Sequence, residues 1–112
     1  MTVTIYHNPR CSKSRQTLDL LTSRGIEPRV VEYLKTPPTA EEIRGLLARL
    51  GLLARDLVRR KEAAEAGLDL SLPDDALVEG MAANPAVIER PIVVNGDRAA
   101  LGRPPEAVLA IL

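Results

Sequence analysis

The sequence has no phenylalanine and no tryptophan, and its two tyrosines are Tyr6 and Tyr33. Sites that stack nucleic-acid bases are built on aromatic side chains, so such a platform is hard to build from this chain. The 15 basic and 15 acidic residues cancel, which leaves no excess positive charge to hold a phosphate backbone. These absences indicate that the protein has no nucleic-acid partner.

Long hydrophobic stretches are missing as well. No apolar run in the sequence approaches the roughly 20 residues that a membrane-spanning helix requires. Residues 1–5 also lack the basic region and the apolar stretch that begin a secretory signal. We therefore expect no membrane association and a cytoplasmic location.

Cysteine and histidine each occur once, as Cys11 and His7. One cysteine cannot close an internal disulfide, and with one histidine it cannot supply the four ligands of a structural zinc site. We therefore expect no metal and no bound cofactor. Any redox reaction of this thiol must take its second thiol from another molecule.

The N-terminal third of the chain has the pattern of a βαβ unit. Residues 3–7 and 29–34 are rich in β-branched side chains and predict strands. Residues 11–24 contain neither proline nor glycine and predict a helix that ends at Gly25. Because a strand, a helix and a strand follow one another closely, the two strands should be parallel.

The C-terminal part predicts a hairpin followed by a helix. Residues 91–94 and 98–101 predict two antiparallel strands, because Asn95-Gly96 between them favours a type I′ turn. A last helix follows Pro105. Its expected buried residues are Val108, Leu109, Ile111 and Leu112.

The middle of the chain is predicted to be helical. Thr39 and Glu42 match a capping box, which starts a helix closed by Gly51. A short helix is expected over residues 54–61, a helical turn over residues 62–67, another helix after Pro73, and a short turn at Asn84-Pro85. The expected core-facing residues of this region are Ile43, Leu46, Leu47, Leu50, Leu77, Val78 and Met81. With 112 residues, we expect a single domain, residues 1–112, with a helical insertion over about residues 36–88.

Cys11 is a candidate nucleophile because it lies where the first strand gives way to the first helix. The unpaired N–H groups and the positive end of a helix stabilise a thiolate and lower the pKa of a cysteine. Arg10 and Lys13 add positive charge nearby. His7 is expected to tune the thiolate or to act as an acid or base, or else only to bond the backbone. Ser14, in place of a second cysteine, either bonds the thiolate or lies on the helix surface.

Three arginines stand out by position, namely Arg59, Arg90 and Arg103. A guanidinium group is a fork of fixed donors that suits tetrahedral oxyanions. The Arg90-Pro91 bond is able to be cis, which would place Arg90 beside Cys11. Spacing alone leaves open whether the three are merely surface arginines.

Three motifs together resemble one known family, the glutaredoxin-coupled arsenate reductases. They are the run Ile5–Arg15, the run Glu89–Val94 and the run Gly102–Glu106. The resemblance covers nearly the whole chain. It implies an α/β thioredoxin-like fold with a mixed four-stranded sheet and an inserted helical block.

The family resemblance also implies a site and a reaction. It places the nucleophile on Cys11 and its assisting histidine on His7. The anion-binding arginines fall on Arg59, Arg90 and Arg103, with Arg60 the alternative to Arg59, and the cis proline falls on Pro91. The implied reaction reduces arsenate to arsenite through a cysteinyl-arsenate adduct, with glutathione as cosubstrate and glutaredoxin as partner.

Two other functions remain open from the sequence. A glutathione-linked thiol oxidoreductase could use Cys11 on another substrate, with the arginines holding carboxylates. A regulator of the Spx type, which binds RNA polymerase, would share the fold. Many such regulators use a Cys-x-x-Cys switch, which Ser14 removes here.

Overall fold

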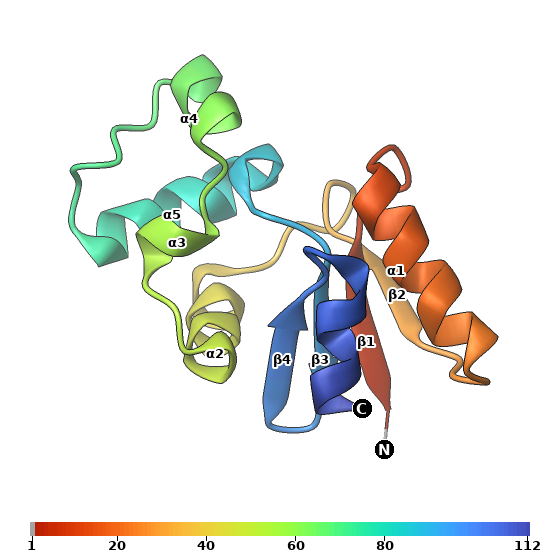
Figure 1. Ribbon diagram of the computed structural model, residues 1–112. Coiled ribbons are helices and arrows are strands. Elements are labelled where there is room, and N and C mark those ends of the chain that lie inside the picture. The colour runs from red at the N-terminus through yellow and green to blue at the C-terminus, as the bar shows by residue number, and fades with distance from the viewer. Residues whose placement is uncertain (1) are drawn as a thin grey trace. The chain divides into compact units, whose positions relative to one another are not determined.

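The computed structural model describes residues 2–112, which fold into two compact units. The first unit contains the chain up to Thr36 together with Arg90–Leu112, and the second contains Pro37–Glu89. Figure 1 shows the order of the elements along the chain. Among the described residues, no helix is both long enough and apolar enough to cross a membrane.

The first unit is built on a four-stranded mixed sheet formed by residues within 2–112. Its strands are β1 (Val3–His7), β2 (Arg29–Glu32), β3 (Ile92–Asn95) and β4 (Arg98–Leu101), in the order β2-β1-β3-β4. β1 is parallel to β2 and antiparallel to β3, and β4 is antiparallel to β3. The predicted α/β, thioredoxin-like sheet is thus confirmed.

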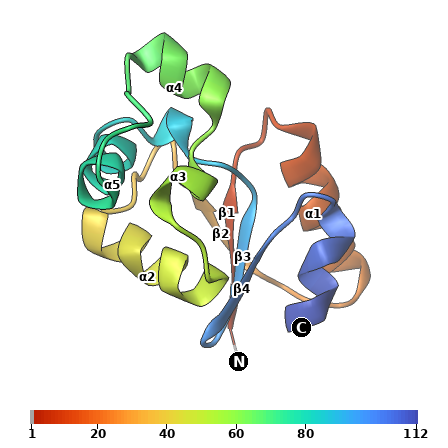
Figure 2. The same cartoon turned by 60° about the vertical axis from the view of Figure 1, so that its left-hand side comes forward.

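Two helical elements cover one face of this sheet. They are α1 (Ser12–Ser23) and the 3₁₀ helix η2 (Pro105–Ile111), which pack on each other. Both lie on the same side of the sheet in Figure 2. The alternation of buried residues along β1 turns every second side chain toward the interior. The core between the layers consists of Val3, Ile5, Leu21, Val93, Val108 and Ile111.

Gly102 allows α1 to approach the chain that leaves β4. A Cβ atom there would lie 2.7 Å from Pro91 Cγ and closer still to Thr17 Oγ1. We expect Gly102→Ala to lower the free energy of unfolding by about 1–3 kcal/mol, because the packed neighbours must move. Urea titration measures this loss. Gly45→Ala is the control, since its Cβ would meet only the end of the flexible Arg49 side chain, and an equal loss in both variants would contradict the packing argument.

The second unit is helical. It contains α2 (Ala40–Leu50), α3 (Ala54–Leu57), α4 (Arg60–Ala66), α5 (Asp74–Ala83) and the 3₁₀ helix η1 (Pro85–Val87). The predicted capping box forms, because Glu42 N donates to Thr39 Oγ1 and Thr39 N donates to Glu42 Oε1. α2 packs on α5. The buried residues of these two helices are Ile43, Leu46, Leu47, Leu77, Val78 and Met81, as expected, whereas Leu50 is only partly buried.

The predicted helix over residues 54–61 is wrong in the middle. Val58 leaves the helix and forms an antiparallel bridge with Ile88. Two backbone bonds flank the bridge, from Arg59 N to Val87 O and from Glu89 N to Leu57 O, each 2.7 Å long. Pairing with a distant segment overrides the local helical preference, so α3 ends at Leu57 and α4 begins at Arg60.

Three predictions for the first unit need correction. Asn95 pairs with Arg98, so the turn residues are Gly96 and Asp97. Gly96 has a φ of 66°, whereas no residue other than glycine within 2–112 has a positive φ, which fits a type II′ turn and not type I′. The last helix is a 3₁₀ helix, in which Leu109 is only half-buried and Leu112 is exposed. The strand predicted over residues 29–34 ends at Glu32, because Lys35 N and Thr36 N turn back to the Glu32 carbonyl.

Candidate active site

Cys11 occupies the N-cap position of α1, directly after a tight turn that follows β1. Cys11 N donates to Asn8 O and Arg10 N donates to Asn8 Oδ1, each at 3.0 Å. The Arg15 side chain closes the same turn from the helix, because Nη1 donates to Pro9 O at 2.8 Å. The turn is therefore held by three hydrogen bonds, and it places the half-buried thiol at the start of the helix.

Opposing effects act on the Cys11 thiol. Burial is the largest of them and raises its pKa. The backbone N–H groups of Ser14 and Lys13 bond the sulfur and lower the pKa, and Arg90 lowers it further by its charge and by a hydrogen bond. The lowering effects together outweigh burial, so the pKa of Cys11 lies below its ordinary value. The site therefore favours the thiolate, which is the nucleophilic form.

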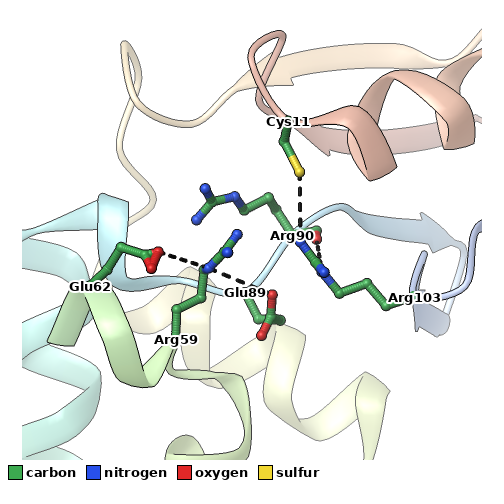
Figure 3. Close-up of polar contacts among 6 residues, drawn as sticks. All are labelled: Cys11, Arg59, Glu62, Glu89, Arg90 and Arg103. Atoms are coloured by element: carbon green, nitrogen blue, oxygen red, sulfur yellow. Dashed lines mark hydrogen bonds and ion pairs between the residues drawn. The ribbon is translucent and has the colours of Figure 1, made fainter. Parts of the chain in front are cut away.

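Arg103 reaches the same sulfur from the loop that follows β4. Its Nη2 lies 3.7 Å from Cys11 Sγ, and its Nε donates to the carbonyl oxygen of Arg90 at 2.8 Å (Figure 3). Both Arg90-Pro91 and Arg103-Pro104 are cis; the sequence pointed to the first and not to the second. The structure thus brings Cys11, Arg90 and Arg103 together within the first unit.

His7 and Ser14 form a buried pair behind the turn. His7 Nδ1 lies 2.6 Å from Ser14 Oγ, and that hydroxyl also accepts a bond of 3.0 Å from Asn8 N. Ser14 is fully buried, so the alternative of a helix-surface serine is wrong. Burial, the largest effect, and the charge of Arg15 lower the pKa of His7, while Glu32 raises it, and the net shift is downward. The imidazole is therefore neutral near pH 7 and contacts the turn through Ser14.

Arg59 lies in the second unit, at the N-cap of α4. Its Nε lies 2.9 Å from Glu62 Oε2 and 3.9 Å from Glu89 Oε1. In Figure 3 the dashed lines from both carboxylates meet at Nε, and the rest of the guanidinium extends beyond them. Arg59 is partly buried whereas Arg60 is exposed, so Arg59 is the arginine that the fold of this unit orients.

Sequence reasoning missed these two carboxylates and Asn8. Glu62 stands three residues after Arg59, which is the spacing of an ion pair on a helix and could have identified it. No local sequence pattern pointed to Glu89, because the bridge between Val58 and Ile88 brings it close to Arg59. Asn8 before a proline is a common turn former, and that signal was available.

The lowered pKa of Cys11 predicts a shifted reactivity profile. The alkylation rate with iodoacetamide should rise with pH to a plateau, with its midpoint below the value of about 8.5 for a free cysteine. Arg90→Gln should move the midpoint upward by about one unit, because the thiolate loses a neighbouring positive charge. Stopped-flow alkylation from pH 4 to 10 measures both midpoints. Arg98→Gln, on β4, is the control and should leave the midpoint in place; a wild-type midpoint at or above 8.5 would contradict the assignment.

A thioredoxin-like domain with one activated thiol beside two guanidinium groups defines a class of thiol-dependent proteins. Comparison with known proteins identifies the family within this class. Residues 6–111 match the sequence model of the ArsC family. YfgD of Escherichia coli K12, described as uncharacterized, is 54% identical over 98% of this chain and 96% of its own. The arsenate reductase of Neisseria meningitidis serogroup A is 48% identical over 98% and 97%. A solved structure of an arsenate reductase from Vibrio cholerae is 52% identical, covers 100% of this chain and 98% of its own, and has a TM-score of 0.94.

This chain therefore belongs to the ArsC family. The matched region contains every candidate site residue, from His7 to Arg103.

Proposed function

We propose that this protein is an oxidoreductase that reduces arsenate to arsenite through an adduct on Cys11. The observation that carries the proposal is the Cys11 thiol, whose pKa is lowered and which lies 3.7 Å from the guanidinium of Arg103. Relatives named arsenate reductase, at 48% identity over 98% of the chain, support the same assignment.

Arg90 and Arg103 bind the oxyanion in this proposal. A guanidinium group offers several N–H donors in one plane, and its charge does not titrate near neutral pH. Such preorganised donors stabilise the negative charge on the arsenate oxygens while the thiolate attacks. Arg59 supplies a third guanidinium group, as the family resemblance implies, and Glu62 and Glu89 fix its direction.

The first chemical step forms a bond between Cys11 Sγ and arsenic. The thiolate supplies the electron pair of this bond, and one arsenate oxygen leaves as water after protonation. Arsenic remains pentavalent in the resulting cysteinyl arsenate. His7 assists through Ser14, which holds the turn that carries the thiol.

The second step needs an external thiol, because the chain has no second cysteine. The thiolate of glutathione attacks Cys11 Sγ, a disulfide bond forms, and the sulfur–arsenic bond breaks with its electron pair left on arsenic. Arsenic becomes trivalent and is released as arsenite. Glutaredoxin then takes the glutathione from Cys11 by thiol–disulfide exchange, which restores the free thiol.

The test is arsenate-dependent oxidation of NADPH with glutathione, glutaredoxin and glutathione reductase supplied. Turnover that stops when either arsenate or glutathione is omitted supports the proposal, and arsenite should appear in equal amount to the NADPH consumed. Absence of turnover from a protein with a reactive Cys11 would overturn it. That result would favour a glutathione-linked thiol enzyme with another substrate.

A further inference from the structure

A pocket of about 230 Å³ lies beside the turn that carries Cys11. One wall is the turn itself, residues 7–10, and the other is the end of β2 with the residues after it, including Glu32, Leu34 and Lys35. Ligand pockets for a whole drug-sized molecule are usually larger, at about 300–1,000 Å³. The size therefore suits one end of a small flexible ligand.

The charged groups of this pocket match an α-amino-acid head group. Glu32 Oε1 and Lys35 Nζ are 3.5 Å apart, so one carboxylate and one ammonium stand side by side. An α-amino acid carries an ammonium and a carboxylate on one carbon, which is the complementary pair. The side chains of Lys35 and Glu32 are 79% and 40% exposed, and an exposed ion pair of this kind contributes little to stability, so a ligand can replace it readily.

The pocket also borders the residue that precedes the thiol. Arg10 lines it and immediately precedes Cys11 in the chain, which separates their Cα atoms by about 3.8 Å. Leu34 lines it as well and is 44% exposed, so it offers an apolar surface to a methylene chain. A ligand whose charged head lies here can thus extend a flexible arm along the turn toward Cys11.

We propose that this pocket binds the γ-glutamyl head of the thiol cosubstrate. The α-ammonium of glutathione pairs with Glu32, and its α-carboxylate pairs with Lys35. The two methylenes of the γ-glutamyl arm lie against Leu34, and the cysteinyl thiol points toward Cys11. The inference rests on the proposed function for the identity of the cosubstrate, although the binding itself requires no arsenate.

The experiment follows thiol exchange at Cys11 without arsenate. Cys11 is first converted to its mixed disulfide with 5-thio-2-nitrobenzoate, whose release on attack by a second thiol is measured by absorbance. Each attack forms a disulfide between Cys11 and the incoming thiol and releases one thiolate. Second-order rate constants are compared for glutathione and for 2-mercaptoethanol, which has no amino-acid head.

The Glu32→Gln variant is decisive, because the two explanations predict opposite changes in the rate constant for glutathione. Removal of a negative charge should speed the approach of an anionic thiol if only the overall field matters. Loss of the ammonium partner should instead slow glutathione by roughly fivefold and leave 2-mercaptoethanol unchanged. Glu27→Gln is the matched control, an exposed glutamate in the same unit with the same change of charge. Acceleration of glutathione in Glu32→Gln would overturn the proposal.

Lys35→Gln tests the other half of the pair. It should slow glutathione by a similar factor, whereas Lys61→Gln, an exposed lysine of the second unit, should not. Equal slowing by both lysine variants would also overturn the proposal. If these effects appear in a protein that fails to reduce arsenate, the pocket assignment stands and the proposed function falls.

Discussion

Replacement of Cys11 by serine is expected to abolish arsenate reduction. The kcat should fall by at least about a thousandfold, because a single essential nucleophile is lost and no other thiol exists in the chain. A serine hydroxyl is almost entirely protonated near neutral pH, so the helix N–H groups and Arg90 have no thiolate to stabilise. Initial rates in the coupled NADPH assay measure the loss.

The fold should survive the Cys11→Ser change. Cys11 stands at the N-cap of α1, where its sulfur faces the N–H groups of Lys13 and Ser14, and serine is among the residues most favoured there. The turn is held by the backbone of Cys11 and Arg10 and by Arg15, and none of these contacts depends on sulfur. The midpoint of thermal unfolding should therefore be equal or slightly higher.

Cys11→Ala serves as the comparison, since alanine lacks both the nucleophile and the cap. It should be as inactive as Cys11→Ser and slightly less stable. Retention of more than one tenth of the wild-type kcat in either variant would contradict the assignment of Cys11 as nucleophile.

The position of Cys11 could be read from the sequence because the signals are local. A β-branched run and a following stretch free of proline and glycine fix the junction of strand and helix within one or two residues. The capping box of α2 is local in the same way. Such features depend on neighbours three or four residues apart, which the sequence displays directly.

The surroundings of the thiol could not be read in that way. Arg103 stands 92 residues after Cys11, and only the folded sheet brings its loop back to the turn. In the second unit, the bridge between Val58 and Ile88 likewise interrupts a stretch that looks helical, because pairing with a distant segment competes with local preference. The family resemblance identified Arg103 before the fold did, whereas only the structure shows the hydrogen bond from Arg103 to the Arg90 carbonyl.

That hydrogen bond leads to the second large expected effect. Arg103→Ala should lower kcat/KM for arsenate by about a hundredfold to a thousandfold, the loss typical of one preorganised oxyanion donor. Arg103→Lys keeps the charge, yet a single ammonium cannot both donate to Arg90 O and lie beside Cys11 Sγ, as Nε and Nη2 do here. We therefore expect the lysine variant to remain at least about tenfold below wild type.

Steady-state kinetics with varied arsenate, at saturating glutathione, separate these cases. Arg98→Ala and Arg98→Lys are the matched controls, because Arg98 is exposed on β4 of the same unit and carries the same charge. Wild-type kinetics in Arg103→Lys would mean that charge alone matters. The paired contacts of the Arg103 guanidinium group with the Arg90 carbonyl and the Cys11 sulfur would then have no part in catalysis, because the point charge of a lysine ammonium would replace them fully.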